Sequence, residues 1–480
     1  MISITTNTSP SACVHGQRSL SKALTAGFAW VVFSWLLLLL VLVQTPVLAQ
    51  SSNPEQEALP EITDAASIRM PADMSKVDFY LITVDVGNHV WDNFGHTALR
   101  VVDSESNSDL VFNWGLFDIS VGNVTFASNF LRGILNYQLG VSPPGWELGR
   151  YEREQRTVWQ DRLNLTNEQK ATLYRRLAWN LREENIVYSY QYFFDNCTTR
   201  VRDYLNEALG GRLESQNRAL VQRTFRDEVM AHYASVPYVA FGLDVLMNDR
   251  IDRRMTQWEE MFLPSGLRQE LLSFPSDVNL SGQRQPMLTD GTVVMEFQPP
   301  DAGPNPYHVA ALLLLLPVAL LFFRLKRIPL ASFSSQTGFT LRSPALSYRL
   351  LGLVGGLVAL CSGLFGLIMT VAWLQSGHLD LHYNLNLLLF WPTDFIGFVY
   401  ALRWLLFGKG CAVSKAHHNV IIVYLLCHLL ALLGYVVVAL TGLAAQEVDS
   451  LLLYVVPALL GLALLVWNAG FSAVRKIRFF

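Results

Sequence analysis

The sequence contains little charge, few cysteines and no internal repeat. Asp, Glu, Lys and Arg make up only 16% of its 480 residues, and the formal net charge is −3. A nucleic-acid partner requires a strongly basic surface, so this composition gives such a partner no support and we expect none. The Cys and His residues lack the paired spacing of a zinc site, and we expect neither a metal nor a cofactor.

The apolar residues are distributed unevenly along the chain. Residues 50–306 mix charged and apolar residues as globular domains do, whereas apolar runs of about 17 to 26 residues recur from Tyr307 onward, as bilayer spans require. The sequence therefore predicts a water-soluble domain followed by a transmembrane domain over 307–480. We expect about five transmembrane helices, at about 307–323, 349–374, 384–406, 419–442 and 451–470.

Lys and Arg residues fall in alternate loops of the membrane part. They follow the first, third and fifth spans, whereas the loops 375–383 and 444–450 contain none. Cytoplasmic loops concentrate these residues, so the two loops and the soluble domain should lie together outside the cytoplasm. Residues 1–49 fit this orientation, because they resemble a signal peptide cleaved near Ala49, or else an uncleaved anchor.

This organisation leaves Cys197 as the one cysteine of the exported domain. Cys13 falls in the targeting segment, and Cys361, Cys411 and Cys427 fall in or beside the spans. A thiol without a disulfide partner is a liability in an oxidising compartment, so its presence favours a reactive role. A buried, inert thiol is the alternative.

The exported domain begins with short strands and continues with helices, which predicts an α+β fold. A capping box at Thr166–Gln169 precedes a helical pattern over 170–183, and another helix should run from Cys197 to Leu209. Alternating β-branched and aromatic residues predict three strands, at 77–84, 96–102 and 110–114.

Two reactive side chains stand at the start of regular elements: His96 opens a predicted strand and Cys197 opens a predicted helix. A helix N-terminus stabilises a thiolate and a nearby imidazole can take the thiol proton, so the two form a plausible nucleophile and base. A third polar group must hold the imidazole in place. Asn113 on the following strand is the first candidate for this role, and Asp118 is the second.

Simpler interpretations of these residues stay open. His96 could be a structural histidine, and His89 is a rival base seven positions earlier. Asp195 and Asn196 suit the cap of the helix that begins at Cys197. Three carboxylates lack the spacing of an acid and base pair and are expected on a solvated face: Glu147, Glu152 and Glu154.

The order of the motifs resembles a known superfamily. Phe-Gly-His-Thr-Ala on a strand, Phe-Asn-Trp-Gly at 112–115 and Phe-Asp-Asn-Cys-Thr-Thr at a helix start look like the circularly permuted papain-like proteins. More closely, the layout resembles the Lnb-type bacterial lipoprotein N-acyltransferases, which combine such a domain with a C-terminal membrane bundle. This resemblance covers about residues 77–210. It implies that Cys197 and His96 are the catalytic pair, and it leaves the third residue unassigned.

The resemblance implies a multi-pass acyltransferase of the bacterial inner membrane with its catalytic domain on the periplasmic side. Cys197 would take an acyl chain from a phospholipid as a thioester and pass it to the N-terminal amine of a diacylated lipoprotein. The expected fold is a permuted papain-like α+β domain followed by an all-α membrane bundle. The expected division is a linker over 50–75, the catalytic domain over 76–264 and a connector over 265–306.

The third predicted span carries polar residues where a bilayer makes them costly. His378, His382, Asn384 and Asn386 lie at its outer end, and Asp394 lies near its middle. We expect this face to line a groove through which lipid enters. The alternative is an Asp394 kept neutral and hydrogen-bonded between helices.

Two other functions fit the same residues. A Cys-His hydrolase of peptidoglycan or lipid esters would use the same pair, whereas a non-catalytic membrane sensor or partner would need neither. A hydrolase releases a free acid or a cut peptide, while a transferase makes an amide, so the products separate the two enzymes.

Overall fold

The computed structural model describes most of the chain after residue 68. The chain divides into two units, Met1–Glu61 and Ile62–Phe480, and all described residues belong to the second. The predicted targeting segment, most of the linker and Asp118 lie outside the described residues. The described ranges are 69–116, 128–129, 132–133, 136–280, 283–289, 291–325, 331–334, 338–341, 345–407 and 415–471.

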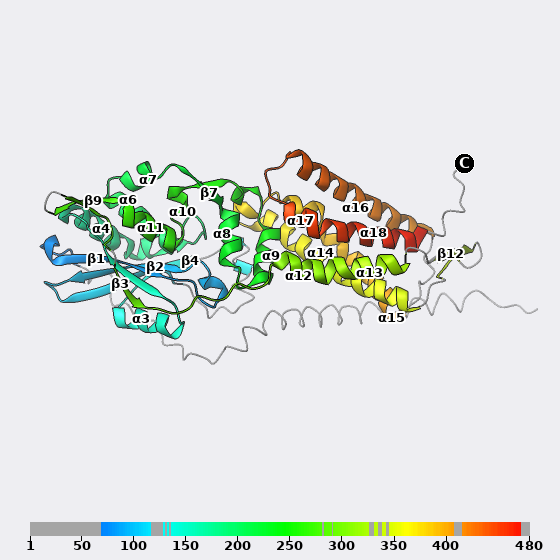
Figure 1. Ribbon diagram of the computed structural model, residues 1–480, viewed down its shortest axis with the longest axis horizontal. Helices are drawn as coiled ribbons and strands as arrows, with labels where there is room; N and C mark the ends of the chain where they lie inside the picture. Colours follow the sequence, from blue (N-terminus) through cyan, green and yellow to red (C-terminus); the bar gives the residue numbers. More distant parts are fainter. Residues whose placement is uncertain are drawn as a thin grey trace, which may run out of the picture. The chain divides into compact units, whose positions relative to one another are not determined.

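A seven-stranded antiparallel sheet organises the N-terminal part of the described chain (Figure 1). The strand order is β11-β5-β1-β2-β3-β4-β6. The three strands predicted from the sequence are confirmed as β1, β2 and β3. The strands are β1 (Val77–Val84), β2 (His96–Asp103), β3 (Ser108–Leu116), β4 (Asn136–Ser142), β5 (Val158–Arg162), β6 (Val187–Ser189) and β11 (Thr292–Met295).

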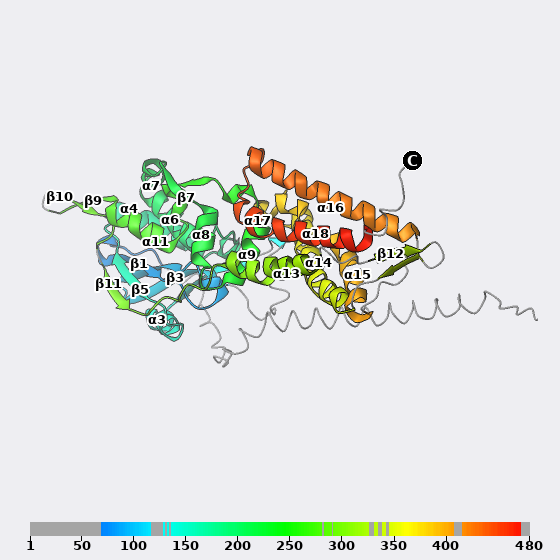
Figure 2. The ribbon, with the colours of Figure 1, turned by 45° about the vertical axis from the view of Figure 1, so that its right-hand side comes forward.

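Helices cover both faces of this sheet (Figures 1 and 2). One face carries α4 (Asn167–Asn180), α6 (Cys197–Ala208) and α11 (Pro264–Ser273), and the other carries α3 (Pro144–Arg153). The two predicted helices are confirmed as α4 and α6, and the capping box before α4 is present. The smaller elements are α5 (Glu183–Ile186), α7 (Arg212–Gln216), β7 (Leu220–Thr224), α8 (Phe225–His232), α9 (Pro237–Leu246), β8 (Arg254–Thr256), α10 (Gln257–Glu260), β9 (Pro275–Leu280) and β10 (Gln283–Pro286).

The alternation of side chains along the strands divides the core into two layers. On β1, Phe79 and Leu81 are buried in the layer beneath α4, α6 and α11, whereas Ile82 and Val84 are buried in the layer beneath α3. Burying a side chain of this size stabilises the fold by about 1.5–3 kcal/mol. A shift of one residue in the pairing would exchange the two layers, so the hydrophobic pattern fixes the register.

The core of the domain extends beyond residue 264, where the sequence predicts its boundary. Leu267 and Leu271 of α11 belong to the main core, and β11 pairs with β5 at the edge of the sheet. The first part of the expected connector over 265–306 therefore completes the domain. The sequence could not show this, because β11 is only four residues long and its partner strand lies more than a hundred residues earlier.

The C-terminal part is helical and contains about three candidate apolar spans. Pro306–Phe323, Arg349–Gln375 and Tyr424–Thr441 are long and apolar enough to cross a membrane, and Asp449–Leu465 is shorter. Among the described residues the count rises to four if one bent pair of helices is a single span, so the predicted count of five is not confirmed. The elements are α12 (Pro306–Ala310), a π-helical turn (Ala311–Leu315), α13 (Leu316–Leu325), β12 (Ala331–Ser334), β13 (Gly338–Leu341), α14 (Ala345–Gln375), α15 (Phe395–Phe407), α16 (Lys415–Thr441), α17 (Asp449–Tyr454) and α18 (Val456–Phe471).

The third predicted span is not a continuous helix. Three short 3-10 helices precede α15, and the pair Leu379–Leu388 and Pro392–Phe407 is bent by 51°. Backbone outside a helix needs other partners where water is absent. Here Asn248 Nδ2 donates to the carbonyls of Leu379 and His382, at 2.9 and 2.6 Å. The 3-10 helices are η7 (Leu379–Leu381), η8 (Leu385–Leu388) and η9 (Pro392–Asp394).

The short apolar helix α9 packs against the membrane part. Val245 is fully buried in a core that also contains Met369 of α14 and Tyr435 of α16. Its carbonyl accepts hydrogen bonds from Asn384 Nδ2 at 2.9 Å and Asn386 Nδ2 at 2.8 Å. The domain is therefore packed on the membrane part and not only tethered to it by the chain.

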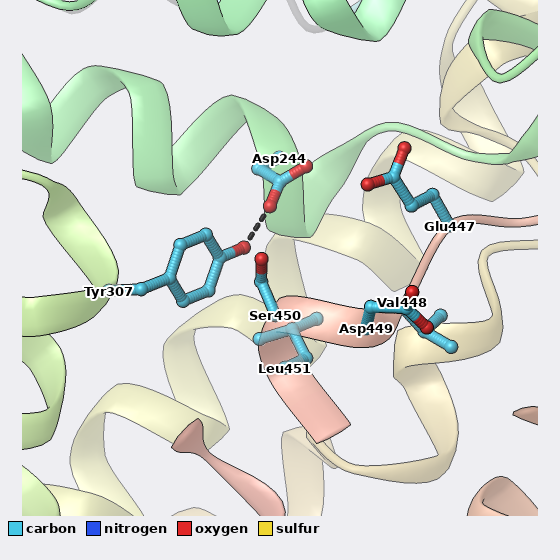
Figure 3. A pocket seen from close by; sticks show the side chains of 7 residues that line it. All are labelled: Asp244, Tyr307, Glu447, Val448, Asp449, Ser450 and Leu451. Atoms are coloured by element: carbon cyan, nitrogen blue, oxygen red, sulfur yellow. Dashed lines mark hydrogen bonds between the residues drawn. The ribbon is translucent and has the colours of Figure 1, made fainter. Parts of the chain in front are cut away.

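A second contact joins α9 to the start of the first span (Figure 3). The hydroxyl of Tyr307 donates to Asp244, which also pairs with the buried Arg226 at 2.5 Å. Glu447 lies beside them, and its backbone N–H donates to Asp252 at 2.9 Å. These bonds and those of Asn248 bring the two loops without Lys or Arg against the domain, which is the arrangement that the charge distribution predicts.

Candidate active site

His96 and Asn113 meet across two neighbouring strands. Ala98 of β2 pairs with Asn113 of β3, so the side chains of His96 and Asn113 project from the same face of the sheet. Asn113 Oδ1 lies 2.6 Å from His96 Nε2, and Asn113 is fully buried. The structure thus brings together the predicted base and the first candidate for its orienting group.

Glu147 fixes the orientation of the Asn113 amide. Asn113 Nδ2 donates to both carboxylate oxygens of Glu147, at 3.0 and 3.1 Å. Because the amide nitrogen faces Glu147, the amide oxygen faces His96 and accepts a hydrogen bond from the ring N–H. His96 Nε2 is therefore the protonated ring nitrogen, and Nδ1 carries the lone pair that a base requires.

Glu147 is a buried carboxylate, so its predicted place on a solvated face is wrong. It is 1% exposed, accepts a hydrogen bond from Ser142 Oγ at 2.8 Å and pairs with Arg150 at 3.1 Å. On the same helix Glu152 is exposed, because five residues carry the chain to the opposite side of α3. No sequence spacing links Glu147 to Asn113, since the contact depends on how α3 lies on the sheet.

Cys197 is the first residue of α6, as the sequence predicts. Asn196 caps the helix: its side chain accepts from Thr199 N at 2.8 Å, and Thr199 Oγ1 accepts from Asn196 N at 2.7 Å. This capping box holds the thiol beside the N–H groups of the first turn, which favour negative charge on sulfur.

The thiol of Cys197 lies against the start of β2. The backbone N–H groups of Thr97 and Thr198 donate to its sulfur, and the hydroxyl oxygens of Thr97 and Thr198 are 3.0 Å apart. A Cβ added to Gly115 would lie 3.9 Å from Cys197 Cβ and 4.0 Å from His96 Cε1. Gly115, which has a φ of +92°, therefore keeps the space next to Cys197 and His96 open.

Burial holds both reactive groups in their neutral forms. It raises the pKa of the Cys197 thiol, although the N–H groups of Thr97 and Thr198 act in the opposite direction. Burial, with the guanidinium groups of Arg150 and Arg156, lowers the pKa of His96 to about 3. A neutral thiol beside a neutral imidazole reacts when the base takes the proton during attack, and no standing thiolate is required.

The other sequence candidates lie elsewhere. His89 is exposed and its ring stacks on Trp91, with the centroids 5.0 Å apart. Asp195 pairs with Arg200, with Oδ1 2.5 Å from Nε and Oδ2 2.6 Å from Nη2. These contacts give His89 and Asp195 structural partners, whereas His96 and Cys197 both lie next to Gly115.

A cavity of about 360 Å³ is lined by residues of β1, β5 and α11. Gly95, which precedes His96, and Val84, which pairs with His96 in the sheet, both line it. Trp159 contributes an aromatic surface, and the buried hydroxyl of Thr83 lines the cavity without a hydrogen-bond partner in the described structure. The volume lies within the range of small-molecule sites, but His96 and Cys197 are not among the residues that line the cavity.

The polar residues of the third predicted span do not form a lipid groove. Asn384, Asn386 and Asp394 are all buried. Asp394 accepts from Ser362 Oγ of α14 at 2.5 Å and Tyr424 OH of α16 at 2.6 Å. The groove prediction is therefore wrong for these residues, and the alternative of hydrogen bonds between helices describes Asp394.

Residues 65–227 match the family model of the Lnb N-terminal periplasmic domain. Over this segment the chain is similar to that family. The match includes His96, Asn113 and Cys197, and it confirms the Lnb resemblance that the three motifs indicate. No curated protein and no solved structure matches the chain. With its apolar helices, the chain is a membrane protein with a periplasmic domain that is similar to the Lnb domain.

Proposed function

We propose that this protein is an acyltransferase that moves an acyl chain from a phospholipid to the N-terminal amine of diacylated lipoproteins. The observation that carries the proposal is that Cys197 and His96 both lie next to Gly115, in a domain that is similar to the Lnb periplasmic domain and is packed on apolar helices. The catalytic domain would lie on the periplasmic side of the inner membrane and the helices would cross it several times.

In the first half-reaction the Cys197 sulfur attacks the carbonyl carbon of a phospholipid ester. A carbon–sulfur bond forms and the ester carbon–oxygen bond breaks, which releases a lysophospholipid. The thiol proton passes to His96 Nδ1 and then to the leaving oxygen. Asn113 holds the ring in the tautomer that permits this transfer, and Glu147 holds Asn113.

In the second half-reaction the neutral α-amine of the lipoprotein attacks the thioester carbonyl. A carbon–nitrogen bond forms, the carbon–sulfur bond breaks, and the amine proton passes through His96 to the Cys197 sulfur. The free thiol is thus restored and the product is an amide.

The membrane setting favours transfer over hydrolysis. Acyl chains anchor both the donor and the acceptor in the same leaflet, so a domain packed beside that leaflet meets them at high effective concentration. Burial of the thiol, which is 9% exposed, also limits the access of water to the thioester.

The test uses the full chain in detergent with phospholipid and a diacylated lipopeptide, and follows the mass of the peptide. We expect the wild type and a Cys361→Ser control, which changes an exposed cysteine of α14, to add one acyl chain. Cys197→Ser should add none. Free fatty acid or cut peptide in place of the acylated product would show a hydrolase. Absence of any product that depends on Cys197 would show a non-catalytic partner.

A further inference from the structure

The loop that follows α14 reaches from the membrane part to the segment before the nucleophile. This loop, residues 376–384, contains the buried Asp380, which accepts a hydrogen bond from the hydroxyl of Tyr192. Tyr192 is 9% exposed, and its ring lies 4.9 Å from the ring of His378 in the same loop, measured between centroids. A hydroxyl bonded to a buried carboxyl group is a strong contact, because water is excluded from it.

Other residues of the domain also form hydrogen bonds with the 376–384 loop. The backbone N–H of Asn248 donates to the carbonyl of Asp380 at 2.7 Å, and Asn248 Nδ2 binds the carbonyls of Leu379 and His382. At the start of the loop, Gly377 N donates to the carbonyl of Arg132 at 3.0 Å. These hydrogen bonds hold Asp380 in place, and Tyr192 is hydrogen-bonded to it.

Tyr192 is in turn bonded to the residue that precedes the nucleophile. Its carbonyl accepts from Asn196 Nδ2 at 2.9 Å, and Asn196 Nδ2 also donates to the carbonyl of Phe262 at 3.1 Å. The oxygen of the same Asn196 side chain caps α6 through Thr199 N. One amide side chain thus joins Tyr192 to the helix start that presents the thiol of Cys197.

We propose that Asp380 and Tyr192 are positioning residues through which the membrane part holds the Cys197 thiol in its reactive place. The order of contacts is Asp380 to Tyr192, Tyr192 to Asn196, and Asn196 to the first turn of α6. The membrane helices then complete the active site as well as anchor it. The reaction affected rests on the proposed function, but the position of the thiol can be measured without it.

The first variant is Tyr192→Phe, which removes one hydroxyl and keeps the ring that packs on Phe193 and His378. The matched control is Tyr307→Phe, which removes another tyrosine hydroxyl from a half-buried aspartate where the domain meets the membrane part, Asp244. Both changes weaken the contact between the two parts, but only the first reaches the loop before Cys197.

Two measurements on the full chain report the position of the thiol. The first is the rate of iodoacetamide alkylation at Cys197 against pH, read by peptide mass, with Cys361 as an internal reference. The second is single-turnover formation of the acyl-enzyme from phospholipid. In Tyr192→Phe we expect the loosened thiol to meet more water, so its alkylation should be faster and its apparent pKa should move toward about 8.5. Acyl-enzyme formation should fall roughly 10- to 100-fold, as a small misplacement of a nucleophile causes.

A rescue experiment separates positioning from packing. Asp380→Asn keeps an oxygen that can accept from Tyr192 and should retain acyl-enzyme formation within about tenfold of the wild type, since the bond becomes neutral but is not lost. Asp380→Leu should resemble Tyr192→Phe.

The outcomes separate the two proposals. Faster alkylation together with slower acyl-enzyme formation in Tyr192→Phe, with both rates unchanged in Tyr307→Phe, supports the positioning role. Wild-type behaviour of Tyr192→Phe, or the same changes in both variants, overturns it. If the wild type forms no acyl-enzyme, the proposed function fails, and a shifted alkylation profile in Tyr192→Phe alone still supports positioning.

Discussion

Replacing Glu147 by Gln would remove the group that fixes the orientation of Asn113 while keeping its size. In the native chain the carboxylate can only accept, so the Asn113 amide has one orientation and His96 has one tautomer. A glutamine can offer its own N–H to Asn113, which would then rotate its amide and donate to His96 Nε2. The ring proton would move to Nδ1, and the nitrogen needed as a base would be occupied.

The size of the effect follows from the bonds that change. A hydrogen bond to a charged group contributes about 1.5–3 kcal/mol, and a loss of that size in the transition state lowers the rate roughly 10- to 150-fold. Arg150, which pairs with Glu147 at 3.1 Å, would also lose this salt bridge. Losing a nearby negative charge cannot raise the low pKa of His96, so the loss of rate should be the same from about pH 5 to 8.

The assay is the single-turnover rate of acyl transfer to a diacylated lipopeptide. Glu152→Gln on the same helix is the matched control and should keep the wild-type rate, since Glu152 is exposed. In an Asn113→Ala background the Glu147→Gln change should cause little further loss of rate, because Glu147 acts on His96 only through Asn113. A Glu147→Gln enzyme within twofold of the wild type, or a full additional loss in the double variant, would refute the relay from Glu147 to His96.

Three further predictions concern the same domain. Gly115→Val should abolish alkylation and acylation of Cys197. The valine side chain would enter the space next to Cys197 and His96, and the backbone φ of +92° suits glycine and not valine. Unchanged alkylation by iodoacetamide would contradict this prediction. Because the folded-state pKa of His96 is near 3 and the unfolded value is 6.5, only the unfolded chain binds this proton between these pH values. The free energy of unfolding should therefore fall by up to ~1.4 kcal/mol per pH unit as pH drops through that window, and chemical unfolding should show a shallower fall in His96→Gln. Leu267→Ala should lower the free energy of unfolding of the periplasmic domain by about 2–5 kcal/mol, and a neutral result would return residues 265–306 to the role of a connector.

The local elements of the domain could be predicted because their signals are local. The alternation in 77–84 and 96–102 and the capping box at Thr166–Gln169 lie within single elements, and the structure has β1, β2 and α4 there. The place of His96 next to Asn113 also follows once β2 and β3 are paired, because their spacing in the chain sets the register. Glu147 could not be found in this way, since its contact depends on the docking of α3.

The polar residues of the third predicted span show why a hydropathy pattern misleads where a domain packs on membrane helices. A span with Asn384, Asn386 and Asp394 indicates either a lipid path or an internal role, because a bilayer tolerates such groups only where they have partners. Two partners settle the matter here: the carbonyl of Val245, to which both asparagines donate, and the hydroxyl of Tyr424, which binds Asp394. The asparagines substitute for water at a carbonyl of α9, so this apolar helix can lie against the bundle. The same irregular backbone keeps residues 376–384 out of a continuous α-helix, and Asp380, in the short helix η7, forms its hydrogen bond with Tyr192 there.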